Sequence, residues 1–414
     1  MNVYEMIKKD EALCECLRLE EQRQENNLEM IASESIQPSA TLAVAGSIFN
    51  NKTAVGLPHK QRLKGSQFAA ALEELAAKRA CEVFGADHAN MLPYSGSMAN
   101  YCAYSAVLAL GDRVLSMNPS AGAHQTHGAA ANVSSKMYQF EYFGLDPETL
   151  LIDYEEAERK TREFKPKLMV VGSAAYSRNI DFKRLADIAH ENGAYLMCDI
   201  AHFSGLIAAG ASPSPVPYAD IVTASTTKTM CGPHSGFIMC KAELADAIDK
   251  SVYPGNVASL HLQTIAAMTY AIGASRTDEF KALMANVVKN AQYFCEALKQ
   301  RGFGIVTGGT DCHMFVADLR PFGADCEQIA DIFEQIGITV NTKGIPFDDS
   351  VKPRGLRAGT TVLTQRGFDF AALDEVADIW LQVVRSPEDE QVIADAKAHV
   401  IDLCERFPIP KMYK

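Results

Sequence analysis

The stretch Ala194-Tyr195-Leu196-Met197-Cys198-Asp199 is a short, mostly apolar run that ends on a carboxylate. A helical pattern from Asp181 to Asn192 precedes it, and Thr223-Ala224-Ser225-Thr226-Thr227-Lys228 closes a second apolar run. Short buried runs that alternate with helices are typical of parallel strands in an α/β sheet. The sequence therefore predicts an acid and a lysine at the ends of two strands of one sheet.

Asp199 and Lys228 together suggest pyridoxal phosphate (PLP) chemistry. A lysine amine can hold this cofactor covalently, and a carboxylate can keep the ring nitrogen protonated so that the ring accepts electrons. The spacing alone is weak support, because an acid and a lysine at strand ends are more often a cap and a surface charge. Other segments strengthen the hypothesis.

Three further segments carry groups that can bind ligands. Ser95-Gly96-Ser97 opens a helical pattern, and its hydroxyls and free helix N–H groups suit a phosphate, although an ordinary N-cap is the alternative. His124 lies in a loop of small residues that would let a ring approach closely. Arg357 can grip a carboxylate with two hydrogen bonds, although an arginine near a turn is usually solvated.

Composition restricts the class of protein. The chain has 414 residues, of which 48% are hydrophobic and 22% charged, as expected for a globular protein of two domains. A net charge of −12 argues against nucleic acid or an anionic membrane as the main partner. The sequence shows no signal-peptide core, no apolar window of membrane-spanning length and no cluster at metal-ligand spacing. We therefore expect a cytoplasmic protein without a metal site.

The alternation of elements predicts an α/β fold with a mostly parallel sheet and helices on both faces. After about residue 280 the order of predicted helices and strands changes to that of a smaller α+β unit. We expect an N-terminal arm and a large cofactor-binding domain in residues 1–280, and a small C-terminal domain in residues 281–414. The predicted strands are 90–92, 113–115, 167–171, 194–198, 220–224, 236–240, 304–306 and 314–316, and the predicted helices are 98–110, 181–192, 281–301, 326–335 and 371–384.

Segments along nearly the whole chain resemble the serine hydroxymethyltransferase family. The resemblance implies a fold-type-I PLP-dependent transferase with a mostly parallel seven-stranded sheet. It also implies a homodimer or homotetramer whose active sites are shared between subunits. The matching segments are Asn27–Glu34, Tyr94–Asn100, His124–Gly128, Ala175–Arg178, Asp199–His202, Thr226–Thr229 and Gly355–Thr360.

The same resemblance implies a role for each matching position. Lys228 looks like the Schiff-base lysine, and Asp199 like the partner of the pyridine nitrogen. His124 matches the histidine that stacks on the cofactor ring, and His202 the one near its phenolic oxygen. The remaining cofactor contacts would be Ser95, Gly96, Ser97 and Ser225, and the groups that hold the carboxylate of the amino-acid substrate would be Ser33 and Arg357.

This chain departs from the family pattern on one wall of the site. The family carries a glutamate where Val55 stands and tyrosines where Arg62 and Leu63 stand. Valine transfers no proton, and loss of the phenols removes a stacking surface for a pterin. Gln125 replaces an apolar residue of the pterin slot, and the segment 347–354 is shorter than in the family. These losses predict little or no folate dependence, with loop drift as the alternative.

Three functions remain open from the sequence. The first is making or breaking the Cα–Cβ bond of a small β-hydroxy amino acid of the serine/glycine type. The second is racemisation, transamination or β-elimination with the same cofactor, and the third is a catalytically silent paralogue that binds PLP. A new basic cluster in the loop is either solvated or receives an acidic substrate group; its members are His59, Lys60, Arg62 and Lys64.

Overall fold

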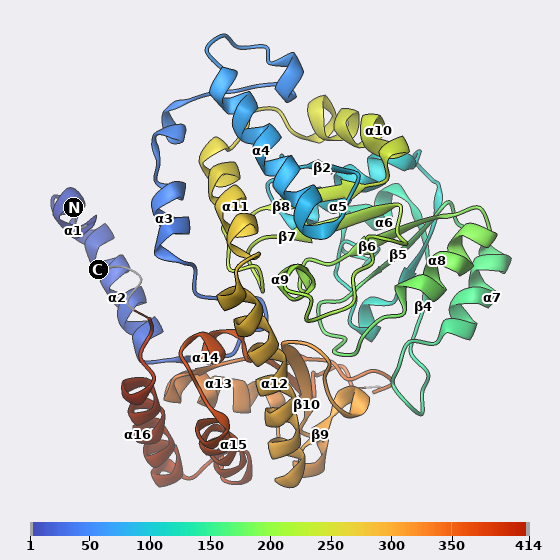
Figure 1. The fold of residues 1–414 in the computed structure, drawn as a ribbon. Coiled ribbons are helices and arrows are strands. Elements are labelled where there is room, and N and C mark those ends of the chain that lie inside the picture. Colours follow the sequence, from blue (N-terminus) through green and yellow to red (C-terminus); the bar gives the residue numbers. More distant parts are fainter. Residues whose placement is uncertain (1–2, 349, 411–414) are drawn as a thin grey trace.

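The structure is a computed structural model that describes residues 3–348 and 350–410 (Figure 1). Its centre is a seven-stranded sheet in the order β2-β8-β7-β6-β5-β3-β4. All strands run parallel except β8, which is antiparallel to both of its neighbours. The strands are β2 His88–Asn90, β3 Arg113–Met117, β4 Gln139–Phe143, β5 Leu168–Gly172, β6 Tyr195–Asp199, β7 Ile221–Ser225 and β8 Gly236–Cys240.

Buried strands account for the continuous apolar runs of the sequence. Every residue of β5, β7 and β8 is buried, as expected for strands covered on both faces. Helices flank the sheet on both sides (Figure 1). They are α4 Gln67–Phe84, α5 Gly96–Val107, α6 Val133–Met137, α7 Tyr154–Phe164, α8 Phe182–Glu191, α9 Ser204–Ala208, α10 Ala245–Lys250 and α11 Leu262–Ala274.

A smaller antiparallel sheet in the order β12-β13-β10-β9 follows in the chain. Its strands are β9 Gly304–Ile305, β10 Met314–Asp318, β12 Asn341–Lys343 and β13 Gly355–Gly359. The long helix α12 Asp278–Gln300 leads into this part and packs against it, and Trp380 is fully buried there. The other helices are α13 Cys326–Ile336, α14 Thr361–Gln365, α15 Phe370–Arg385 and α16 Glu390–Arg406.

The N-terminal segment packs on the C-terminal part. β1 Leu28–Glu29 pairs in parallel with β11 Ile338–Thr339, and Leu28 belongs to the same hydrophobic cluster as Trp380. Before it, α1 Val3–Ile7 and α2 Glu11–Glu25 stand away from the large sheet (Figure 1), and their residues are exposed or half-buried. Nowhere in the described ranges is a helix long and apolar enough to cross a membrane.

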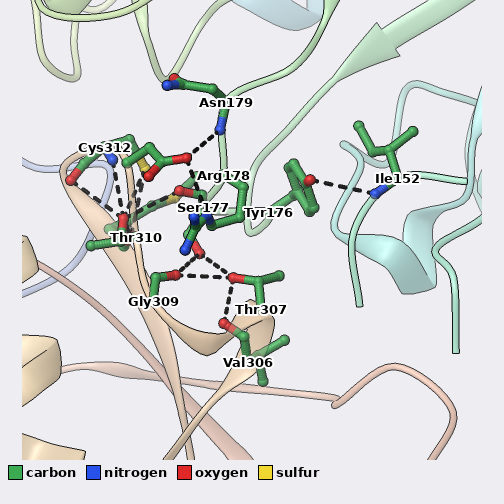
Figure 2. A network of polar contacts seen from close by, with 12 residues as sticks. Ile152, Tyr176, Ser177, Arg178, Asn179, Val306, Thr307, Gly309, Thr310 and Cys312 are labelled. Carbon is green, nitrogen blue, oxygen red and sulfur yellow. Dashed lines mark hydrogen bonds and ion pairs between the residues drawn. The ribbon is translucent and has the colours of Figure 1, made fainter. Parts of the chain in front are cut away.

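The two sheets are joined by a polar network that is shown in Figure 2. The Ser177 hydroxyl lies 2.9 Å from the Thr307 hydroxyl and donates to the Gly309 carbonyl. Arg178 donates through Nε to Asp311 at 3.1 Å, and the backbone N–H of Asn179 donates to the same carboxylate. These bonds fix the segment after β5 against the smaller sheet.

Most predicted elements of the large sheet lie within one to three residues of the observed ones. The predicted strand 90–92 was placed two residues too late in the chain, because β2 runs from His88 to Asn90. The predicted helix 98–110 begins earlier, at Gly96, since the Ser95 side chain caps it by accepting a hydrogen bond from the Met98 N–H. The division of the chain at residue 280 stays a prediction; α12 contributes Met284 to one hydrophobic cluster and Phe294 to the other.

Candidate active site

The candidate active site lies where β6 and β7 end. These strands are parallel neighbours, and Asp199, the last residue of β6, pairs in register with Thr223. Lys228 follows three residues after the end of β7. Carboxyl ends of parallel strands form the usual binding crevice of open α/β sheets. A cavity of about 430 Å³ opens here; its walls include Ser33, Ser95, Gly96, Ser97, His124, Asp199, His202, Ser225 and Lys228.

Asp199 is buried and receives three hydrogen bonds. Asn100 Nδ2 and His127 Nε2 donate to its Oδ2 at 2.8 and 3.2 Å, and the Ala201 N–H donates to its Oδ1 at 2.9 Å. Burial alone would raise the pKa of this carboxyl. The hydrogen bond from His127, together with the positive charges that His127 and His124 carry when protonated in acid, outweighs burial and lowers the pKa below its usual value. Asp199 is therefore a fixed negative charge at neutral pH.

His124 is held in one orientation by Thr126. Its Nδ1 lies 2.8 Å from the Thr126 hydroxyl and accepts a 3.3 Å hydrogen bond from the Thr126 N–H, so the hydrogen is on Nε2. The Thr126 hydroxyl itself accepts from Asn100, which ties this loop to Asp199. Burial lowers the pKa of His124. The ring is a neutral, flat surface on one side of the cavity.

His202 is fully packed against a second buried histidine. Its ring stacks on that of His313 with centroids 5.6 Å apart, and His313 donates through Nε2 to the Ala32 carbonyl at 3.0 Å. Burial lowers the pKa of His202, and it lowers that of His313 to about 3. Both rings are thus neutral, and His313 links His202 to the N-terminal segment that carries Ser33.

The Lys228 side chain is half-buried between the charges of Asp199 and Arg357. Burial lowers the pKa of its amine, the charge of Arg357 lowers it further, and Asp199 partly opposes the change. An amine with a lowered pKa is more often in the unprotonated form that attacks a carbonyl. The Ser35 hydroxyl, on the N-terminal segment, donates to the Thr227 carbonyl at 2.9 Å and steadies the loop that carries Lys228.

The N-terminus of α5 faces the same cavity. Ser95, Gly96 and Ser97 all line it, and the first N–H groups of a twelve-residue helix have no partners within the helix. β8 passes directly beneath. A Cβ on Gly236 would lie 2.2 Å from the Ser95 carbonyl oxygen and 2.7 Å from the Gly96 nitrogen, so glycine is required for this approach. The result is an anion site with hydroxyl and N–H donors.

Ser33 and Arg357 come from segments that are paired with each other. The Gly359 N–H donates to the Met30 carbonyl at 2.7 Å, which sets the N-terminal segment against the end of β13. Ser33 lines the cavity. Arg357 donates from Nε to Asn341 Oδ1 at 2.9 Å and from Nη1 to the carbonyl of Ala174, a cavity residue. Two of the five N–H donors of a guanidinium are thereby used, which leaves three for a carboxylate.

The loop of residues 51–65 contributes no residue to the Lys228 cavity of its own chain. Val55 pairs with Ser259 through an isolated bridge, and the Arg62 N–H donates to the Val55 carbonyl at 2.8 Å. The Arg62 guanidinium sits over the Tyr253 ring, 5.8 Å from its centroid. His59 and Lys60 line a different cavity. The four basic side chains of the loop are exposed, and the structure does not bring them to Lys228.

Sequence reasoning missed the residues that hold the site from behind. Asn100, Thr126, His127 and His313 are buried and act through tertiary contacts. Asn100, Thr126 and His127 lie in segments that resemble the family, but the resemblance was not carried over to a role for them, and His313 lies in none of those segments. No local pattern distinguishes such side chains from ordinary core polar residues.

These residues fit PLP. The donors at the α5 N-terminus suit its phosphate, the flat face of His124 suits its ring, and the ionised Asp199 suits a protonated ring nitrogen. Lys228 is the lysine available for covalent attachment in this cavity. When bound, the cofactor would accept electron density from the Cα of an amino acid. The chain's own part is to hold, orient and shield the reacting groups.

The mostly parallel sheet with a lysine and an acid at neighbouring strand ends defines a fold-type-I PLP-dependent transferase. In agreement with this, the sequence model of the serine hydroxymethyltransferase family matches residues 6–380 of the chain. This chain belongs to the serine hydroxymethyltransferase family, whose members are PLP-dependent enzymes that act on small amino acids.

Proposed function

We propose that this enzyme uses PLP to make or break the Cα–Cβ bond of a small β-hydroxy amino acid with little or no need for folate. The observation that carries the proposal is the shared cavity of Lys228, Asp199 and the α5 N-terminus; Arg357 lies beside it, bonded to the carbonyl of the cavity residue Ala174. This set combines a covalent anchor, a carboxylate that would keep the ring nitrogen protonated, a phosphate site and a carboxylate-binding group.

The folate part of the proposal rests on the loop of residues 51–65. Val55, which stands at the position of the family's glutamate, has no group that can exchange a proton. Its carbonyl already accepts the Arg62 N–H, and the Leu260 N–H donates to the neighbouring Ala54 carbonyl. The loop is thus held by backbone bonds that do not depend on the lost side chains. In a folate-free cleavage the β-hydroxyl loses its proton, the Cα–Cβ bond breaks to release an aldehyde, and Cα takes up a proton to give glycine, with no folate needed to accept a carbon.

The test is turnover of serine, threonine, phenylserine, alanine and an acidic β-hydroxy amino acid, each with and without tetrahydrofolate. We expect aldehyde release from at least one β-hydroxy amino acid without folate. Glycine, included in the same panel, should exchange its Cα proton. Alanine reports on racemisation and transamination, which are the competing outcomes. Efficient serine cleavage that depends on tetrahydrofolate would show instead that the parent activity of the family is retained.

If PLP binds but no amino acid in the panel undergoes proton exchange or cleavage, the chain is a silent paralogue and the proposal fails.

Assembly as a homodimer or homotetramer with shared sites is also part of the proposal. It is supported by the exposed faces of α1 and α2 and of the loop, which leave room for a second copy. Size-exclusion chromatography with light scattering measures the assembly directly.

A further inference from the structure

Lys343 is a second cationic side chain near Arg357, and the proposed function gives it no role. It is the last residue of β12 and is only partly exposed. Burial lowers the pKa of its amine, and the neighbouring charge of Arg357 lowers it further. Within residues 3–348 and 350–410, no carboxylate lies within ion-pair distance of its Nζ. Half-burying a cation without a counter-ion has a desolvation cost, which a ligand that supplies the anion would offset.

The strand register places Lys343 and Arg357 on one face of the smaller sheet. Asn341 lies opposite Arg357, and Lys343 lies opposite Gly355. Since side chains alternate along a strand, Asn341, Lys343 and Arg357 project from the same face. Lys343 and Arg357 are diagonal neighbours, whose bases are roughly 7–8 Å apart. That spacing lets a short molecule with two carboxylates contact both side chains.

The face that carries both cations meets the segment after β5. Arg357 reaches the Ala174 carbonyl, and Ala174 lines the main cavity. Lys343 lines a small second cavity with the next residues, Ala175 and Tyr176, and with Val306 and Thr307. Figure 2 shows Tyr176, Val306 and Thr307 in the polar network that joins the sheets. Lys343 therefore lines a cavity with Ala175, the residue that follows the one whose carbonyl Arg357 contacts.

The second cavity is about 10 Å³ in volume, room for a single water-sized group. A carboxylate oxygen fits this space, whereas a tetrahedral phosphate does not. Gly355, opposite Lys343, adds no side chain; a Cβ there would lie 2.8 Å from Val316 Cγ1. Lys343 lines this cavity and not the main one, while Ala174 and Ala175, consecutive in the chain, line the main and the second cavity respectively.

We propose that Lys343 and Arg357 form a two-cation subsite that selects substrates with a second carboxylate, that is, short β-hydroxy dicarboxylic amino acids and the carboxylated aldehydes that form them. This inference rests on the proposed function. In the forming direction a glycine Cα–H bond breaks, Cα bonds to the aldehyde carbon, and the aldehyde oxygen takes up a proton. The step needs no oxidant or reductant.

The experiment compares wild type, Lys343→Met and the control Lys289→Met, whose lysine is exposed on α12. Each holoenzyme adds glycine to glyoxylate, to acetaldehyde or to phosphonoacetaldehyde, and kcat/KM is measured for each aldehyde. Calorimetry of succinate binding gives a second readout without turnover. We expect wild type and Lys289→Met to prefer glyoxylate, and Lys343→Met to lose at least about tenfold of that preference and of succinate affinity.

An unchanged glyoxylate-to-acetaldehyde ratio and unchanged succinate affinity in Lys343→Met would overturn the subsite. So would a wild-type enzyme that prefers acetaldehyde or phosphonoacetaldehyde. Failure of the underlying function has a different signature, because wild type would then exchange no glycine Cα proton. In that case succinate binding decides the subsite: loss only in Lys343→Met supports it, and equal binding in all three proteins refutes it.

Discussion

At the scale of single residues, Asp199 owes its charge to its neighbours. A carboxyl buried to this extent would ordinarily be neutralised, yet Asn100, His127 and the Ala201 N–H supply three donors. Replacing Asp199 by Asn keeps the shape but removes the charge that would hold a ring nitrogen protonated. We expect Asp199→Asn to retain most PLP binding and to lose about 100-fold in kcat, or ~2.7 kcal/mol. Equal turnover would refute this role.

Asp199→Asn should also change how the free energy of unfolding depends on pH. The pKa of Asp199 in the folded chain is lower than its ordinary value of about 3.9, so folding favours the ionised form. Its contribution to the free energy of unfolding is therefore present above about pH 4 and is lost as the pH falls through the folded pKa. The difference in unfolding free energy between wild type and Asp199→Asn, measured with urea, should narrow in acid. A difference that widens there would contradict the assignment.

At the scale of elements, the site depends on how closely β8 passes beneath α5. A methyl group on Gly236 would meet backbone atoms of Ser95 and Gly96, which cannot rotate away. We expect Gly236→Ala to displace the α5 N-terminus, weaken PLP binding at least about tenfold and destabilise the chain by about 1–3 kcal/mol. Equilibrium dialysis and denaturant unfolding measure the two effects.

Gly46→Ala is the matched control for this change. A Cβ on Gly46 would lie 3.7 Å or more from any neighbouring atom, and the backbone φ there is −85°. It should therefore bind PLP with the wild-type affinity. If Gly236→Ala behaves like the control, the close approach of β8 does not shape the phosphate site.

The elements also show what the sequence can and cannot predict. Long buried strands such as β6 and β7 were predictable because burial on both faces leaves an unbroken apolar run. β1 and β11 were missed, since strands of two residues carry no periodicity. Within the site, Lys228 and Asp199 were visible because they end such runs. Lys343 was not, because only the pairing of β12 with β13 brings it near Arg357.

At the scale of the whole molecule, one buried arginine ties the two ends of the chain together. Arg366 follows α14 and donates to the carbonyls of Asn27 at 2.7 Å, Phe407 at 2.6 Å and Cys404 at 3.1 Å. Its partners thus lie in the N-terminal segment and in and just after α16. No local pattern predicts this junction, since it joins residues more than 330 positions apart in the sequence.

The Arg366 junction also bears on the active site, because Ser33 follows the anchored residues. We expect Arg366→Met to leave the carbonyls unpaired and to lower the free energy of unfolding by about 3 kcal/mol. Amide hydrogen exchange should rise in residues 26–31 and 400–407, and KM for the amino acid should increase as Ser33 loosens. Arg385→Met, which changes an exposed arginine at the end of α15, is the control. Faster exchange with an unchanged KM would mean that Ser33 is held by its other contacts, whereas unchanged exchange would show that β1 and β11 hold the arm without Arg366.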